Sequence, residues 1–157
     1  MVEIEIPILS ADERQQKCRE MWTGMMLGNI GFIMRKLGSD ALEELNNEVA
    51  SGCAADMKAQ GVDNPVKFAM NYAVVNKNVF GSKGVNVEGG ADNAVLTTAT
   101  CANLKTAMDF GSRGMPTTKE EYCNGCINGY FKRVAENLGF GLAAEFTDRG
   151  CRIKIHR

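Results

Sequence analysis

The chain carries almost no excess of charge of one sign, and this limits the partners it can have. It contains 18 basic and 19 acidic residues, which gives a net charge of −1 over 157 residues. No block of Lys or Arg stands out, so the electrostatic footprint of a nucleic-acid-binding protein is missing. The end of the chain, "CRIKIHR", is locally basic, but a strand with one polar face explains it more simply. We therefore expect no nucleic-acid partner.

Long apolar runs are lacking as well. The longest, "MWTGMMLGNIGFIM", has 14 residues and is short for a membrane span. The first residues, "MVEIEIPILS", show no basic segment followed by an apolar run, so they predict no signal peptide. These absences predict a cytoplasmic protein with no membrane partner. In that compartment disulfides are rare, and a group of cysteines more often indicates a metal site or catalysis.

Three familiar site patterns are also missing. The glycine-rich segment "GSKGVNVEGGADN" matches neither the dinucleotide-binding nor the P-loop spacing, and we interpret it as a turn. The sequence has one Cys-x-x-Cys pair, whereas a zinc ribbon needs a second. The one histidine, His156, lies on the expected outer face of the last strand. A Cys–His dyad would require that tail to fold inward.

Start and stop signals predict helices in the N-terminal half. Ser10 and Glu13 form a capping box that begins a helix over 10–37. Further helices are expected over 41–60 and 64–76, the latter with a proline in its first turn.

Small residues and cysteines mark the faces of these helices. Gly24 and Gly28 lie four apart, and a glycine inside a helix costs about 1 kcal/mol relative to alanine. We favour close packing of another helix over close approach of a ligand as the reason, and the same stripe also offers a homodimer face. Cys18 and Cys53 are single cysteines on apolar stripes, and we predict that both lie in the core.

The C-terminal half changes period. Alternating and β-branched residues predict a hairpin over 85–100, and a short helix over 102–114 follows. Thr118 and Glu121 form a second capping box, which begins a helix that ends near Gly139. A second hairpin is expected over 140–155.

This order of elements indicates an α+β fold. We predict one domain over 1–157, with a helical cap at 10–78 and an α+β core at 79–157. The helical N-terminal half should pack on a small, mostly antiparallel sheet made of the two hairpins.

Four of the six cysteines fall in the C-terminal half at informative places. Cys101 lies where a strand ends and a helix begins, and there the free N–H groups and the helix dipole favour a thiolate. Cys123 and Cys126 are three residues apart on one helix, so both point to the same side. Cys151 shares the apolar face of its strand. Four thiols directed toward one volume would suit tetrahedral zinc or an iron–sulfur cluster.

Three interpretations of these thiols stay open. They can hold a metal, they can serve thiol chemistry or ligand contact with Cys101 as nucleophile, or they can be reduced thiols of the core. Tyr122 and Tyr130 lie near the Cys-x-x-Cys turn and are candidates for the lining of a small-molecule pocket. Trp22 and Met25 are candidates for an apolar wall opposite them, although a Met-rich stripe is more often core.

The same cysteines carry a family resemblance. A cysteine ends a strand in "TTATC", another lies on a helix in "CNGCINGYF", and a last one follows a glycine in "DRGCRIKI". From about Leu37 to the end, this pattern resembles the L-2-amino-thiazoline-4-carboxylic acid hydrolase-like family. More distantly it is similar to the 4-vinyl reductase type of small-molecule-binding domain. The resemblance implies an α+β domain that holds a small molecule, with Cys101, Cys126 and Cys151 at the family's cysteine positions. It implies hydrolytic ring opening in the named enzyme and sensing or cofactor handling in the vinyl-reductase relatives.

The chain departs from that pattern at two positions. Cys123 adds a fourth thiol, and Ala102 stands where the family usually has a proline. The extra thiol favours a metal centre, so we predict a metalloprotein that binds a [4Fe–4S] cluster or zinc through all four cysteines, with a small molecule nearby. The alternatives are a hydrolase of a small cyclic amidine or thiazoline-type substrate, dependent on Cys101, and a non-catalytic ligand-binding sensor. A second copy of the chain and a redox or enzyme partner are both possible partners.

Overall fold

Helices form the first half of the chain, as predicted. The computed structural model describes residues 7–115 and 117–157. The helices of this half are α1 (Ala11–Lys36), α2 (Ser39–Ala59) and α3 (Pro65–Val74), and a π-helical segment, η1 (Val75–Val79), extends α3. The capping box of α1 is present: Ser10 Oγ accepts the N–H of Glu13, and the Glu13 carboxylate accepts the N–H of Ser10 at 2.7 Å. The Ser10 hydroxyl also donates to that carboxylate at 2.7 Å, and this bond together with the one from the Ser10 N–H holds the pKa of Glu13 below its ordinary value.

The two predicted hairpins join into one antiparallel sheet. Its strands are β1 (Lys83–Gly89), β2 (Asn93–Thr100), β3 (Gly141–Phe146) and β4 (Cys151–His156), in the order β1-β2-β4-β3. The pairing of β2 with β4 connects the hairpins, and it sets Thr98 opposite Cys151. The predicted α+β class is therefore confirmed, with a four-stranded sheet built from two hairpins.

The segments between the hairpins are helical. They are α4 (Ala102–Gly111), α5 (Lys119–Cys126), the π-helical segment η2 (Ile127–Phe131) and α6 (Lys132–Asn137). The second predicted capping box is present: Thr118 Oγ1 accepts the N–H of Glu121, and the Glu121 carboxylate accepts the N–H of Thr118. The predicted helix from this box to Gly139 is thus continuous, but its middle turn is a π turn that the sequence did not predict.

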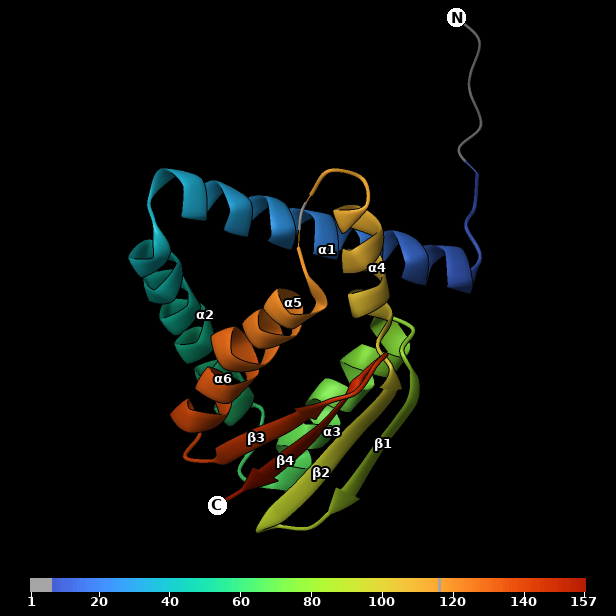
Figure 1. Cartoon of the computed structure of the whole chain (residues 1–157). Helices are drawn as coiled ribbons and strands as arrows, with labels where there is room; N and C mark the ends of the chain where they lie inside the picture. Colours follow the sequence, from blue (N-terminus) through green and yellow to red (C-terminus); the bar gives the residue numbers. More distant parts are fainter. Residues whose placement is uncertain (1–6, 116) are drawn as a thin grey trace, which may run out of the picture.

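Helices cover one face of the sheet and leave the other open. In Figure 1, α3 lies against the sheet, α6 packs beside β3, and α1 crosses one edge of the molecule above α4. Inward-facing strand residues such as Leu96 and Ile155 are fully buried, whereas Arg152 and Lys154 on the opposite face are exposed. The main core lies between α2, α3, α6 and the sheet.

A second, smaller cluster lies between α1, α4 and α5. Its buried members are Leu104, Ala107, Tyr122 and Cys123, with Cys101 packed against them. Gly24 of α1 faces Phe110 here, and a Cβ at Gly24 would lie 3.3 Å from the ring. Close helix packing within the chain therefore accounts for Gly24, as predicted, and a dimer face along this stripe stays a prediction. Among the described residues, no helix is long and apolar enough to cross a membrane.

Candidate thiol site

Cys101 caps helix α4. It is the N-cap residue, and its Sγ accepts the N–H of Leu104 at 3.4 Å. Its own N–H donates to the carbonyl of Arg149 at 2.7 Å, which ties it to the turn before β4. The N–H of Ala102 donates to Ser82 Oγ at 3.1 Å, which ties the same point to the start of β1. Hydrogen bonds to α4, to the turn before β4 and to the residue before β1 thus hold Cys101 in place at the end of β2.

The structure brings the four C-terminal cysteines together. Cys123 is buried on α5, Cys126 is the last residue of that helix, and Cys151 begins β4 on the inward face. Charge on Cys101 would raise the pKa of each of the other three thiols. Cys123, Cys126 and Cys151 influence one another in the same way. Each sulfur therefore lies within electrostatic range of every other.

All four thiols are protonated in this environment at neutral pH. Burial is the main cause, and it raises the pKa of each, to about 12 for Cys151. At Cys101, hydrogen bonds from the helix N–H groups and from Ser82 lower the pKa, but burial outweighs them. The expectation of a lowered pKa at Cys101 is therefore wrong in direction, because removal from water destabilises the thiolate more than the hydrogen bonds at the helix start stabilise it.

The thiols are neighbours without forming a site for a single ion. Across residues 7–115 and 117–157, no three or more His, Cys, Asp or Glu side chains are placed to hold a metal ion. In a tetrahedral zinc site with Zn–S bonds of 2.3 Å, the sulfurs lie about 4 Å apart. A [4Fe–4S] cluster binds its thiolates on separate irons and holds them farther apart.

No protein-family model matches the chain, and no curated protein matches it.

Polar side chains are buried around the same point. Ser82, Thr98, Asn103 and Thr106 are each at most 8% exposed, and all lie on the strand ends or the helix next to Cys101. The Arg19 guanidinium of α1 donates to Thr106 Oγ1 at 2.8 Å. Sequence reasoning did not identify these residues, because Ser, Thr and Asn at element ends usually serve as caps.

Two other candidate groups take structural roles. Glu121 belongs to the capping box at Thr118, and those hydrogen bonds lower its pKa. His156 is exposed on the outer face of β4, as expected, at the end of the strand opposite to Cys151, and a Cβ on Gly141 would meet its ring at 2.3 Å. His156 and Cys151 are therefore separated by the length of the strand, and no Cys–His dyad forms between them.

The four residues proposed to line a pocket do not meet. Trp22 and Met25 are 52% and 63% exposed, and the Trp22 ring lies 6.3 Å from that of Phe80 rather than near either tyrosine. Tyr122 belongs to the small cluster beside Cys123, whereas Tyr130 packs in the main core. The helix periodicity placed Trp22 and Met25 on the apolar side of α1, but Thr23 and its neighbours make the contacts with the rest of the chain.

Tyr130 instead meets Tyr72 of α3, a residue that sequence reasoning missed. The Tyr72 ring contacts Phe131 with 3.9 Å between ring centroids, and its hydroxyl finds no hydrogen-bond partner among the described residues. Burial raises the pKa of Tyr72 and raises that of Tyr130 to about 12. Cys53 and Cys126 both influence these phenols, so the pair lies beside the thiol site.

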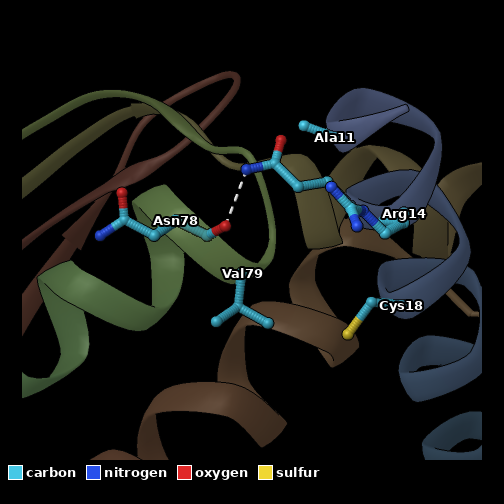
Figure 2. A pocket seen from close by; sticks show the side chains of 6 residues that line it. Ala11, Arg14, Cys18, Asn78 and Val79 are labelled. Atoms are coloured by element: carbon cyan, nitrogen blue, oxygen red, sulfur yellow. Dashed lines mark hydrogen bonds between the residues drawn. The ribbon is translucent and has the colours of Figure 1, made fainter. Parts of the chain in front are cut away.

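A shallow hollow lies elsewhere, between the start of α1 and η1. Its volume is about 320 Å³, and Figure 2 shows Arg14 and Cys18 on one side and Asn78 and Val79 on the other. The Gln15 amide crosses it and donates to the Asn78 carbonyl at 2.7 Å. Cys18 is exposed here, so its predicted place in the core is wrong, whereas Cys53 does pack against the main core.

Proposed function

We propose that the protein binds a thiolate-ligated metal centre through Cys101, Cys123, Cys126 and Cys151. One observation supports the proposal: the four thiols, at the start of α4, on α5 and at the start of β4, are partly or fully buried and each lies within electrostatic range of the others. An apolar core has no need of four such groups, and soft thiolates are the ligands that zinc and iron–sulfur clusters prefer. A reducing compartment keeps these thiols free of disulfides, and we place the protein in the cytoplasm.

Both a [4Fe–4S] cluster and zinc accept four thiolates, so the ligand set is the same for either metal centre. The raised pKa values mean that binding must release protons, so affinity should rise with pH. When bound, such a centre would supply electron transfer, sensing or structural support, and the buried polar side chains next to Cys101 would donate hydrogen bonds to its sulfurs.

Elemental analysis with a visible spectrum tests the proposal on protein purified without air. We expect about four irons and four sulfides per chain and a broad band around 400 nm. One zinc and no colour would support the same ligands with the other metal. Cys101→Ser and Cys126→Ser should lose metal, whereas the matched control Cys18→Ser, an exposed thiol on α1, should keep it. Wild-type protein without metal, after reconstitution with iron and sulfide or with zinc, overturns the proposal.

We also propose that a small molecule binds beside this centre. The unpartnered hydroxyl of Tyr72, next to Tyr130, Cys53 and Cys126, supports a ligand with one hydrogen-bond acceptor and no charge. The resemblance to the hydrolase-like and vinyl-reductase types supports the same expectation. Native mass spectrometry of protein taken directly from cells should show a bound small molecule that Tyr72→Phe loses. If the mutant keeps the same adduct, the Tyr72 site is refuted.

An alternative function is hydrolysis with Cys101 as nucleophile. The amide N–H of Leu104 at the start of α4 favours it, since that donor stabilises a thiolate. Turnover of a thiazoline-type substrate that Cys101→Ser abolishes, in metal-free and folded protein, would support this alternative over the metal centre.

A further inference from the structure

Helix α1 carries an apolar row that the rest of the chain leaves largely exposed, with the Met115 side chain near Gly28 and Val79 across a hollow from Cys18. The row, here called the α1 seam, consists of Cys18, Met21, Met25 and Phe32, with Gly28 between the last two. Met21, Met25 and Phe32 are 67%, 63% and 54% exposed, and Cys18 is exposed too. Large apolar side chains exposed singly are normal, but a continuous row on one helix marks an interaction site.

The spacing of the seam indicates what covers it. Its members follow one another at intervals of three, four, three and four residues, which is the pattern that packs one helix against another as in a coiled coil. The other side of α1 already packs within the chain through Thr23, which is fully buried, and Leu27. The seam extends over about 21 Å at 1.5 Å per residue, long enough for three to four helical turns of contact. Its partner is therefore a helix.

Charge excludes a second α1 as that helix. Arg14 and Lys17 lie at one end of the seam, and Arg35 and Lys36 lie at the other. In a parallel pair each basic end would face itself, and in an antiparallel pair the two basic ends would face each other. Both arrangements place like charges in contact, so the seam fits an acidic helix.

Helix α2 presents such a surface on the same molecule. Leu45 and Val49, one turn apart, are 40% and 44% exposed, and Glu44 and Glu48 lie beside them and are exposed. This set of four residues is here called the α2 stripe. It matches the α1 seam in chemistry: apolar side chains framed by acidic ones, against apolar side chains framed by basic ones. In Figure 1, α2 continues from the end of α1, and both helices lie at the edge of the molecule.

We propose that the protein forms a two-fold symmetric dimer in which the α1 seam of each copy packs against the α2 stripe of the other. Two-fold symmetry makes this contact twice, and a standard interface of roughly 1,600 Å² then needs about half of that area from each contact. Trp22 flanks the seam and is 52% exposed, which places a residue type typical of interface hot spots at its edge. The dimer is independent of the metal centre, because none of its residues belongs to the thiol site.

Sedimentation velocity on the full chain tests the proposal, with circular dichroism as the check on folding. Wild-type protein at micromolar concentration should sediment as a dimer. Met25→Glu and Leu45→Glu should each sediment as monomers with unchanged helix content. The matched control, Met70→Glu on α3, replaces a methionine that is 48% exposed outside both surfaces and should leave the dimer intact. A monomeric wild type, or a dimer that survives both substitutions, overturns the proposal.

Charge exchange tests the pairing itself. Lys17→Glu with Lys36→Glu should weaken the dimer at least tenfold in Kd, and so should Glu44→Lys with Glu48→Lys. All four changes in one chain should restore a Kd near that of wild type, because opposite charges face each other again. Failure of that restoration, or dissociation by Met25→Glu but not by Leu45→Glu, overturns the pairing of α1 with α2 and leaves the seam to another partner.

Discussion

Gly150 is the residue where one added carbon should do the most damage. It is buried and directly precedes Cys151, which pairs with Thr98 across β2 and β4. A Cβ at this position would lie 1.8 Å from the carbonyl oxygen of Thr98 and 3.1 Å from the carbonyl carbon of Ala99. These are backbone atoms, so the clash can be relieved only by separating the two strands. We expect Gly150→Ala to cost about 3 kcal/mol, from overpacking of 1–3 kcal/mol and a weakened ladder hydrogen bond of about 1 kcal/mol.

Differential scanning calorimetry on metal-free protein measures this cost. For a chain of this length, 1 kcal/mol corresponds to roughly 2–4 °C in Tm, so the expected fall is about 6–12 °C. Gly52→Ala is the matched control, because it lies inside α2 and its Cβ would meet no atom within 4 Å. It should raise stability by about 1 kcal/mol through helix propensity. A Tm for Gly150→Ala within about 2 °C of wild type would refute the strand-separation argument.

Three further predictions follow from the caps and the thiols. Thr118→Ala removes the hydrogen bond to Glu121 and should lower the free energy of unfolding by about 1 kcal/mol in urea titrations, whereas Thr118→Ser should keep it. Iodoacetamide should label Cys18 well before Cys123 in peptide mass spectra, because the first is exposed and the second buried with a raised pKa; the reverse order would contradict the placement of α1. Burial raises the pKa of Cys151 to about 12, whereas the thiol of the unfolded chain has a pKa of about 8.5. The contribution of the protonated thiol to stability is therefore complete below about pH 8.5 and is lost as the pH rises toward 12. The urea midpoint of metal-free protein should fall above about pH 9, and a rise would show that the sign is wrong.

Local chemistry made the element boundaries predictable. The hydroxyls of Ser10 and Thr118 cap helices at the predicted positions, since each satisfies an N–H that the helix itself leaves free. Alternation placed Ile153 and Ile155 on the buried face of β4 and Lys154 on the exposed face. These signals are carried by a few residues close in the chain, and the fold class followed from their order.

Long-range contacts decided what the sequence did not predict. Periodicity shows that α1 has an apolar side, but it does not say which side the rest of the chain covers, so it predicts Cys18 in the core and Met25 in a pocket wall, and both side chains are exposed. The pKa of Cys101 depends on burial by segments far away in the sequence, whereas its position at a helix start is local. The pairing of Tyr72 with Tyr130 likewise joins α3 to η2 and has no signature in either segment.

The convergence of the four thiols lies between these cases. The Cys-x-x-Cys spacing fixed a common side for Cys123 and Cys126, and strand alternation fixed the face of Cys151. Their meeting with Cys101 required β4 to pair with β2, and no local pattern specified that neighbour. The sequence thus predicted the side to which each of these thiols points on its own element, whereas the closeness of Cys101 and Cys151 depended on the pairing of β2 with β4.

The π turn at η2 gives the helix from Lys119 to Asn137 one place where its length can change without changing which face it buries. Before it, α5 turns Cys123 toward the small cluster; after it, α6 turns Val134 and Ala135 toward the main core. A wide turn accommodates one residue more than a regular α-helical turn, and each residue of an α-helix advances the chain by about 100°. A point substitution within η2 leaves the phase between the two faces intact. Deleting one residue within η2 would convert the wide turn into a regular α-helical turn and keep the two faces close to their present phase, whereas deleting one residue in α5 or α6 would rotate one half against the other by about 100°.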